Sequence, residues 1–202
     1  MNILKKEKKL KNISEFTKRY FSRLNKIFLN LDISSIKKFE DEFLKLKKTN
    51  STLYVFGNGG AAATAMTMSN DLGFDIKKKT NISNTFKIVS LNDNSSVMTA
   101  IANDVGYENI FLNQIKIHFK KNDKILILSA SGNSENLIKA AKWVKSKKGK
   151  VLSIVGFDGG KIKKLSSSCI HIKTEKGEYG PVEDMQLIIN HIFAHWFQIK
   201  FK

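Results

Sequence analysis

The stretch Leu53-Tyr-Val-Phe-Gly-Asn-Gly-Gly-Ala-Ala-Ala-Thr-Ala-Met-Thr-Met-Ser-Asn-Asp-Leu72 predicts a buried strand, a glycine turn and the start of a helix. Its first four residues are apolar, β-branched or aromatic, as is typical of a strand covered on both faces. Gly57, Gly59 and Gly60 permit a tight turn, and the alanines that follow favour helix. Backbone N–H groups at such a helix N-terminus suit a phosphate, although an ordinary strand–helix turn would use the same glycines.

Composition predicts a folded cytoplasmic protein. The chain has 202 residues, enough for one domain with a full core, and 42% of them are hydrophobic. Cys169 has no partner cysteine, which indicates a reducing compartment. Residues 1–11, expected to be a frayed start or an amphipathic first turn, are polar and basic without an apolar targeting segment. No apolar run reaches the roughly 20 residues that cross a bilayer, so no membrane partner is expected.

The net charge of +17 allows two interpretations. It could mark a surface for nucleic acid or an anionic membrane, or simply reflect lysines on solvated faces. The basic residues are spread along the chain, nearly all are lysine, and no aromatic ladder interleaves them. We therefore expect no nucleic-acid partner, and salt-dependent DNA binding would contradict that expectation. Attraction of anionic sugar phosphates fits either interpretation.

Short apolar runs alternate with helical patterns after an N-terminal pair of helices at about 13–48. Ser34 or Ser35 is the expected cap of the second of these helices, whose apolar faces could pack on another subunit. Five strands are expected, at 53–56, 86–91, 125–128, 151–155 and 169–172. The intervening segments are expected to be helices at 61–73, 95–102, 108–118, 135–147 and 162–165, polar loops at 77–85, 103–107 and 175–181, and a closing helix at 183–200.

This alternation predicts a parallel sheet covered by helices on both faces. Ligands of such sheets lie off the carboxyl ends of the strands. The loops after 53–56, 86–91 and 125–128 should therefore meet at one edge.

The third of these loops, Ser129-Ala-Ser-Gly-Asn-Ser134, supplies three hydroxyls and several backbone N–H groups at a strand–helix junction. Uncharged donors at a helix N-terminus hold a phosphate well. The competing interpretation is that Asn133 or Ser134 merely caps the next helix.

Five motifs in order and spacing resemble the sugar isomerase (SIS) domain family, and among its members the phosphoheptose isomerases. They are Gly57-Asn-Gly-Gly60, Ala102-Asn-Asp-Val-Gly-Tyr107, Leu128-Ser-Ala-Ser-Gly-Asn-Ser134, Gly156-Phe-Asp-Gly-Gly160 and the segment 183–191. The resemblance runs from about 13 to 199 and implies one SIS domain over 1–202, with an α/β core at about 52–200. It further implies a flavodoxin-like three-layer αβα sandwich with a five-stranded parallel sheet, and a homotetramer with active sites shared between subunits.

The resemblance also implies a set of substrate-binding positions. These are Asn58, Gly59, Gly60, Asn103, Asp104, Ser129, Ala130, Ser131 and Ser134. The family usually has a small polar residue such as threonine at position 130 and serine at position 61, where this chain has alanine. Both changes remove a hydroxyl and keep the backbone donors.

The four positions that correspond to the family's catalytic and zinc-binding residues are less well matched. They are Thr67, Asp71, Glu183 and His191, where the family has His, Glu, Gln and His. The resemblance makes Asp71, Glu183 and His191 the catalytic candidates and also the candidate metal ligands, so bound zinc is an open expectation. No nucleotide cofactor is expected.

Aldose–ketose isomerisation needs a base on one carbon and an acid beside the oxygens. His191 is the candidate for one partner, with Glu183 or Asp71 for the other. Helical phase places Glu183 about 80° from His191. The resemblance therefore implies isomerisation of sedoheptulose 7-phosphate to D-glycero-D-manno-heptose 7-phosphate, or a closely related reaction, for the heptose of a surface glycan. The alternative is a non-catalytic module that binds a sugar phosphate.

Overall fold

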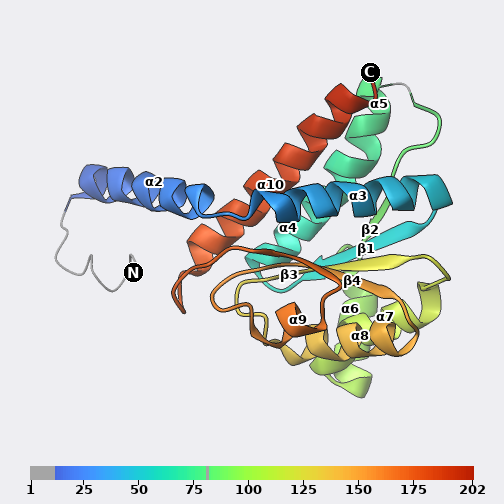
Figure 1. Ribbon diagram of the computed structural model, residues 1–202. Coiled ribbons are helices and arrows are strands. Elements are labelled where there is room, and N and C mark those ends of the chain that lie inside the picture. The colour runs from blue at the N-terminus through green and yellow to red at the C-terminus, as the bar shows by residue number, and fades with distance from the viewer. Residues whose placement is uncertain (1–11, 81) are drawn as a thin grey trace.

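Five parallel strands form one sheet in the order β2-β1-β3-β4-β5 (Figure 1). The computed structural model describes residues 12–80 and 82–202, and the expected start at 1–11 lies outside them. The strands are β1 (Thr52–Gly57), β2 (Lys87–Ser90), β3 (Lys124–Ser129), β4 (Lys150–Val155) and β5 (Ser168–His171). Every neighbouring pair is parallel, which confirms the predicted flavodoxin-like sheet. The strand order changes direction between β1 and β3, where such sheets bind ligands.

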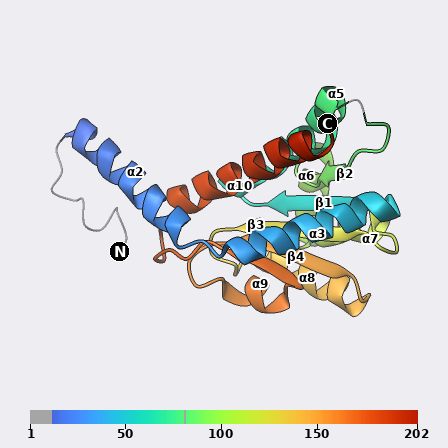
Figure 2. The same cartoon turned by 45° about the horizontal axis from the view of Figure 1, so that its top comes forward.

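Helices cover both faces of this sheet, as Figures 1 and 2 show. On one face, α3, α4 and α10 pack on β1 and β3 through a core that includes Phe43, Met68 and Phe193. On the other face lie α7, α8 and α9. The helices are α2 (Ile13–Leu29), α3 (Ile33–Thr49), α4 (Gly60–Ser69), α5 (Ile76–Thr80), α6 (Ser95–Val105), α7 (Ile110–His118), α8 (Glu135–Ser146), α9 (Gly160–Leu165) and α10 (Tyr179–Lys200).

The two N-terminal helices differ in how they contact the rest of the protein. α3 packs on the core, whereas α2 extends beyond the α/β body in both views (Figures 1 and 2). The cap of α3 is Asp32, which accepts a hydrogen bond from the backbone N–H of Ser34. The expectation that Ser34 or Ser35 caps this helix was wrong, because the aspartate two residues ahead of Ser34 reaches its N–H first.

The helix after the glycine turn is longer than the sequence predicts. A six-residue π-helical segment, Asn70–Asp75, follows α4 directly and leads into α5, so the helical path runs to Thr80. The predicted end at Gly73 and the loop from 77 were therefore wrong. Leu72 and Ile76 are fully buried, and this packing compensates for the low helix propensity of the glycine.

Two other loop boundaries also differ. α6 continues to Val105, so Asn103 and Asp104 lie on a helix and not in the predicted loop. α10 begins at Tyr179, four residues early, because Pro181 falls in its first turn, where a missing N–H costs nothing. Within the described residues, no helix is both long enough and apolar enough to span a membrane.

Candidate active site

A small cavity of about 80 Å³ lies at the carboxyl edge of the sheet, between the loops that follow β1 and β3 and the first turns of α10. We call it the serine-loop cavity. Its lining residues are Asn58, Ala61, Leu128, Ser129, Ala130, Ser131, Ser134, Tyr179 and Glu183. Five of the predicted substrate-binding positions and one catalytic candidate therefore share one cavity. The position agrees with the predicted edge.

The loop after β3, Ser129–Ser134, which we call the serine loop, is held by hydrogen bonds to its own hydroxyl groups. Ser129 Oγ accepts the backbone N–H of Gly132 at 3.0 Å, and Ser131 Oγ accepts that of Asn133 at 3.2 Å. Ser134 is the N-cap residue of α8, yet its side chain makes no capping hydrogen bond, and Asn133 Oδ1 instead accepts the N–H of Lys161. Ser134 therefore occupies the cap position, as the competing interpretation of Asn133 or Ser134 expected, but neither side chain supplies a capping hydrogen bond. The Ser134 hydroxyl is left beside the helix N-terminus, where an anion is stabilised.

The glycine-rich loop Gly156–Gly160 packs against the serine loop. Gly132 has φ +63°, and a Cβ there would lie 2.1 Å from the carbonyl oxygen of Gly159. The N–H of Ile162 donates to the carbonyl of Gly132 at 2.9 Å. This contact explains the Gly156–Gly160 motif, since only glycines let the two backbones approach so closely.

Asparagines join the loops to one another. Asn58 and Asn136 exchange two side-chain hydrogen bonds of 3.0 and 2.9 Å, and Tyr107 donates to Asn58 Oδ1 at 3.1 Å. Asn92, from the loop after β2, donates to the carbonyl of Gly57 and accepts its N–H. The predicted meeting of three loops is therefore confirmed.

Glu183 reaches the cavity from the first turns of α10. A Cβ on Gly60 would lie 2.4 Å from Glu183 Oε2, so the carboxylate lies against the N-terminus of α4. Burial raises the pKa of Glu183, the neighbouring Asp184 raises it further, and the N–H of Gly60 offsets part of the increase. A carboxyl with a raised pKa suits general acid–base chemistry near neutral pH.

The other two catalytic candidates form a separate pair. His191 Nε2 lies 3.6 Å from Asp71 Oδ2, which also accepts a 2.6 Å hydrogen bond from Asn190. Asp71 lies in the π-helical segment, and His191 is eight residues beyond Glu183 on α10. Eight residues of α-helix span about 12 Å. The chain therefore does not bring Glu183 together with this pair.

The predicted metal site does not form within the chain. In the ranges 12–80 and 82–202, no three His, Cys, Asp or Glu side chains gather where they could hold a metal ion. Asp71, Glu183 and His191 are split as described above, and the hydroxyl of Thr67 donates to the carbonyl of Ala63 in its own helix. The three residues present do not fit a zinc site in one chain, because a structural or catalytic zinc needs at least three converging ligands.

Four of the predicted substrate-binding residues lie outside the cavity lining: Gly59, Gly60, Asn103 and Asp104. Asn103 and Asp104 are exposed on α6, where Asn103 donates to Asp104 Oδ1 at 2.9 Å. Three further residues of the site, Tyr107, Asn136 and Tyr179, were not predicted as site residues, although Tyr107 ends one of the five motifs. Asn136 could have been suspected from the sequence on one ground only: it is a polar residue in the first turn of α8, next to the serine loop, on a helix face that is otherwise apolar.

Comparison with known proteins places this site in a family. The sequence profile described as the SIS domain matches residues 17–156. The chain belongs to the SIS domain family. This SIS domain is 34% identical to the phosphoheptose isomerase of Helicobacter pylori (strain HPAG1) over 144 residues, which are 70% of this chain and 71% of that protein. It is 28% identical to a probable phosphoheptose isomerase of Thermoplasma acidophilum over 185 residues, covering 91% and 98% of the two chains.

The fold of this SIS domain also matches a solved structure. The phosphoheptose isomerase of Neisseria gonorrhoeae superposes with a TM-score of 0.80 over 92% of this chain and 99% of that one, at 20% identity. The predicted membership of the SIS domain family is confirmed.

Proposed function

We propose that this protein is a phosphosugar isomerase that converts sedoheptulose 7-phosphate to D-glycero-D-manno-heptose 7-phosphate. The observation that carries the proposal is Glu183, a carboxyl with a raised pKa, in the same cavity as the serine loop. The relatives named phosphoheptose isomerase supply the substrate class.

The serine loop would hold the phosphate. Ser131 and Ser134 would donate hydroxyls, and the N-terminus of α8 would add backbone N–H groups and its dipole. Gly59, where a Cβ would meet nothing within 4 Å, would let the sugar approach the backbone at the start of α4, and Gly60 leaves room for the Glu183 carboxylate. A phosphate held at one end would direct the other end of the sugar, with C1 and C2, toward a catalytic base.

Glu183 is the base in this proposal. Its carboxylate would take the proton from C1 of the ketose and return it to C2 through an enediol, which yields the aldose. A second group must protonate O2 as the enediol forms and accept the proton of the O1 hydroxyl as it collapses to the aldose, and His191 is the candidate for it. Within one chain, His191 lies two turns of α10 away from Glu183. We therefore propose that the His191 of a neighbouring subunit completes the site, or that the two side chains approach each other only after substrate binds.

A homotetramer would provide such sharing. Exposed apolar side chains support it: Phe21 on α2 and Ile188, Ile192, Trp196 and Ile199 along α10. We place the enzyme in the cytoplasm, where a phosphorylated sugar would be available for surface-glycan heptose synthesis. The proposed mechanism needs no zinc, and Asp71, Glu183 and His191 do not converge on a zinc site within one chain.

Incubation of the protein with sedoheptulose 7-phosphate tests the proposal directly. NMR should show aldose formation and, in D2O, incorporation of deuterium at C2, because the proton passes through a base that exchanges with solvent. Parallel reactions with EDTA and with added zinc measure metal dependence. Binding of the ketose without turnover under every condition would instead favour a non-catalytic sugar-phosphate-binding module.

A further inference from the structure

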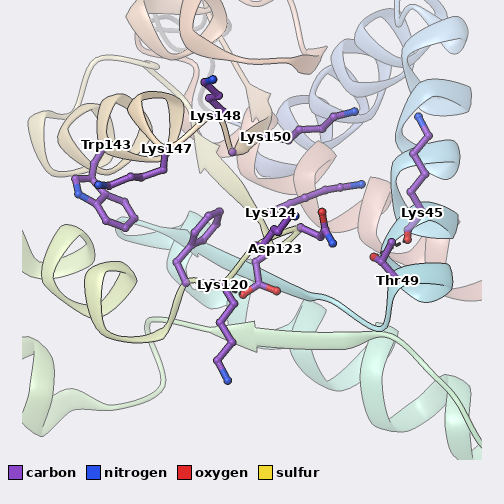
Figure 3. A pocket seen from close by; sticks show the side chains of 13 residues that line it. Lys45, Thr49, Lys120, Asp123, Lys124, Trp143, Lys147, Lys148 and Lys150 are labelled. Carbon is purple, nitrogen blue, oxygen red and sulfur yellow. Dashed lines mark hydrogen bonds between the residues drawn. The ribbon is translucent and has the colours of Figure 1, made fainter.

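A second and much larger cavity lies at the opposite edge of the sheet, where β3 and β4 begin (Figure 3). Its volume is about 840 Å³, within the range typical of small-molecule sites. We call it the amino-edge cavity. The six-residue strand β3 separates it from the serine-loop cavity by roughly 17–20 Å, so a ligand here would not touch the isomerisation site.

Seven of its 13 lining residues are lysines. Lys120 and Lys121 precede β3, Lys147 and Lys148 follow the end of α8, and Lys45 comes from α3. Figure 3 shows lysines from these separate elements around one opening. Lysines that are distant in the sequence are thus concentrated at one place, which the scattered distribution along the chain does not reveal.

The nearby carboxylates neutralise only part of this charge. Glu42 is shared by Lys45, Lys124 and Lys150 at 2.7–2.9 Å. Burial alone would raise the pKa of Glu42, but hydrogen bonds from these lysines lower it to about 2. Asp123 is engaged by the backbone, since its two oxygens accept the N–H groups of Thr52 and Lys120 at 2.8 Å. Neither carboxylate is left to pair with the remaining lysines.

One wall of the cavity is aromatic. Trp143 and Phe119 meet edge to face with ring centroids 6.1 Å apart, and Lys147 Nζ lies 5.7 Å from the centroid of the Trp143 ring. Trp143 is only partly buried. A ligand that bears both negative charge and a flat ring would use both features, because ammonium groups attract phosphates and an indole stacks on a base.

We propose that the amino-edge cavity binds a small organic polyphosphate of the nucleoside di- or triphosphate class. The several uncompensated lysines favour a ligand with more than one phosphate group, and the Trp143–Phe119 wall favours an organic ring over a bare inorganic chain. A volume of about 840 Å³ accommodates one such molecule. This ligand is not a cofactor of the isomerisation, since it lies at the other end of the strands.

Calorimetry with ATP at low ionic strength tests the site. The double variant Lys147→Gln/Lys148→Gln should weaken ATP binding at least about tenfold, because each lysine contributes a charge-assisted contact. The matched control Lys142→Gln/Lys145→Gln removes the same charge from exposed positions of α8 outside the lining, and should change affinity less than about threefold. Circular dichroism verifies that the variants are folded, and both should keep isomerase activity.

Inorganic tripolyphosphate separates the role of the ring from that of the charge. Trp143→Leu should weaken ATP about fivefold or more and leave tripolyphosphate unchanged, as expected when a stacked base is lost. Absence of saturable ATP binding to the wild type would overturn the proposal, as would equal losses in the two lysine pairs. Equal affinity for ATP and tripolyphosphate would contradict the proposed contact between the aromatic wall and an organic ring. Tighter binding of single-stranded DNA than of ATP would show a nucleic-acid surface instead.

Discussion

The carboxyl group of Glu183 combines two properties that a general base needs. It is near the serine loop, and its pKa is raised, first by burial and then by Asp184. Because the pKa is raised, the carboxylate is protonated at a higher pH than in an ordinary glutamate. As pH falls, kcat/KM should therefore begin to drop above the usual glutamate value of about 4.3. A pH–rate profile of the wild type measures this limb.

Two variants connect that profile to Glu183. Glu183→Gln should lower kcat by at least about 100-fold with a small change in KM, since the base is lost and the phosphate contacts remain. Asp184→Asn removes a charge that raises the pKa of Glu183, so its acid limb should move to lower pH while turnover persists. An unchanged limb in Asp184→Asn, or full activity in Glu183→Gln, would assign the base to another residue.

The Ser131 hydroxyl should contribute to phosphate binding because it lines the cavity at the N-terminal side of α8. Ser131→Ala should weaken binding of sedoheptulose 7-phosphate by about 1–3 kcal/mol, the usual cost of removing a hydrogen bond to a charged group. Calorimetry in the Glu183→Gln background measures affinity without turnover. Ser96→Ala, an exposed serine on α6, is the control. Wild-type affinity in Ser131→Ala would place the phosphate elsewhere.

At the scale of elements, α2 fixes the start of α10. Arg23 donates two hydrogen bonds to Glu178, at 3.0 and 2.6 Å, and Tyr20 donates to Asp184 at 2.5 Å. The side chain of Glu178 is fully buried, and Glu183 follows it by little more than one turn. An otherwise projecting helix therefore positions the catalytic candidate.

Loss of the Arg23–Glu178 contact should lower both the stability and the activity of the protein. Arg23→Ala leaves the buried Glu178 carboxylate without its guanidinium, at a cost of about 3 kcal/mol. For a protein of this size, that corresponds to a decrease in Tm of roughly 6–12 °C. Calorimetric unfolding measures the change, and kcat should fall because the start of α10 loosens.

Arg19→Ala is the matched control for this contact. Arg19 also pairs with a glutamate, Glu15, but both side chains are about half exposed. Exposed pairs contribute about 0–1 kcal/mol, so this variant should unfold close to the wild-type temperature. Equal effects of the two arginine variants would mean that the Glu178 contact does not fix α10.

The elements that could be predicted from the sequence are those with strong local patterns. The apolar runs of the strands locate the sheet, and the glycine and serine loops that follow β1 and β3 locate the cavity. Helix ends were harder to predict, because tertiary packing decides them. The buried Leu72 and Ile76 carry the helix past Gly73, and α6 extends through a polar pair that looks like a loop.

The split between Glu183 and the Asp71–His191 pair was only partly predictable. Helical phase indicated that Glu183 and His191 point in different directions, and the structure agrees. The π-helical segment that carries Asp71 was not predictable, because it changes the direction of the side chain without a sequence signal. The asparagine exchange between Asn58 and Asn136 was also missed, since it joins residues 78 positions apart.

At the scale of the whole molecule, the two ends of the sheet differ in chemistry. The carboxyl edge presents uncharged donors, which suit a phosphate that must bind and leave, and the carboxyl group of Glu183, which suits acid–base chemistry. The amino edge presents lysines around an aromatic wall. The net charge of +17 is therefore not only a solvated background, because part of it is gathered at one cavity.

The exposed apolar residues of α2 and α10 make a prediction about assembly. Phe21 is 66% exposed on a helix that extends beyond the body of the chain, which is costly unless another subunit covers it. In the proposed homotetramer, Phe21→Glu should produce smaller species in sedimentation analysis and reduce turnover, since the proposed sharing of His191 between subunits would be lost. Ser22→Glu, also on α2 but at a polar exposed position, introduces the same charge and should keep the wild-type assembly. A wild type that sediments as a monomer with full activity would show that one chain forms a complete site.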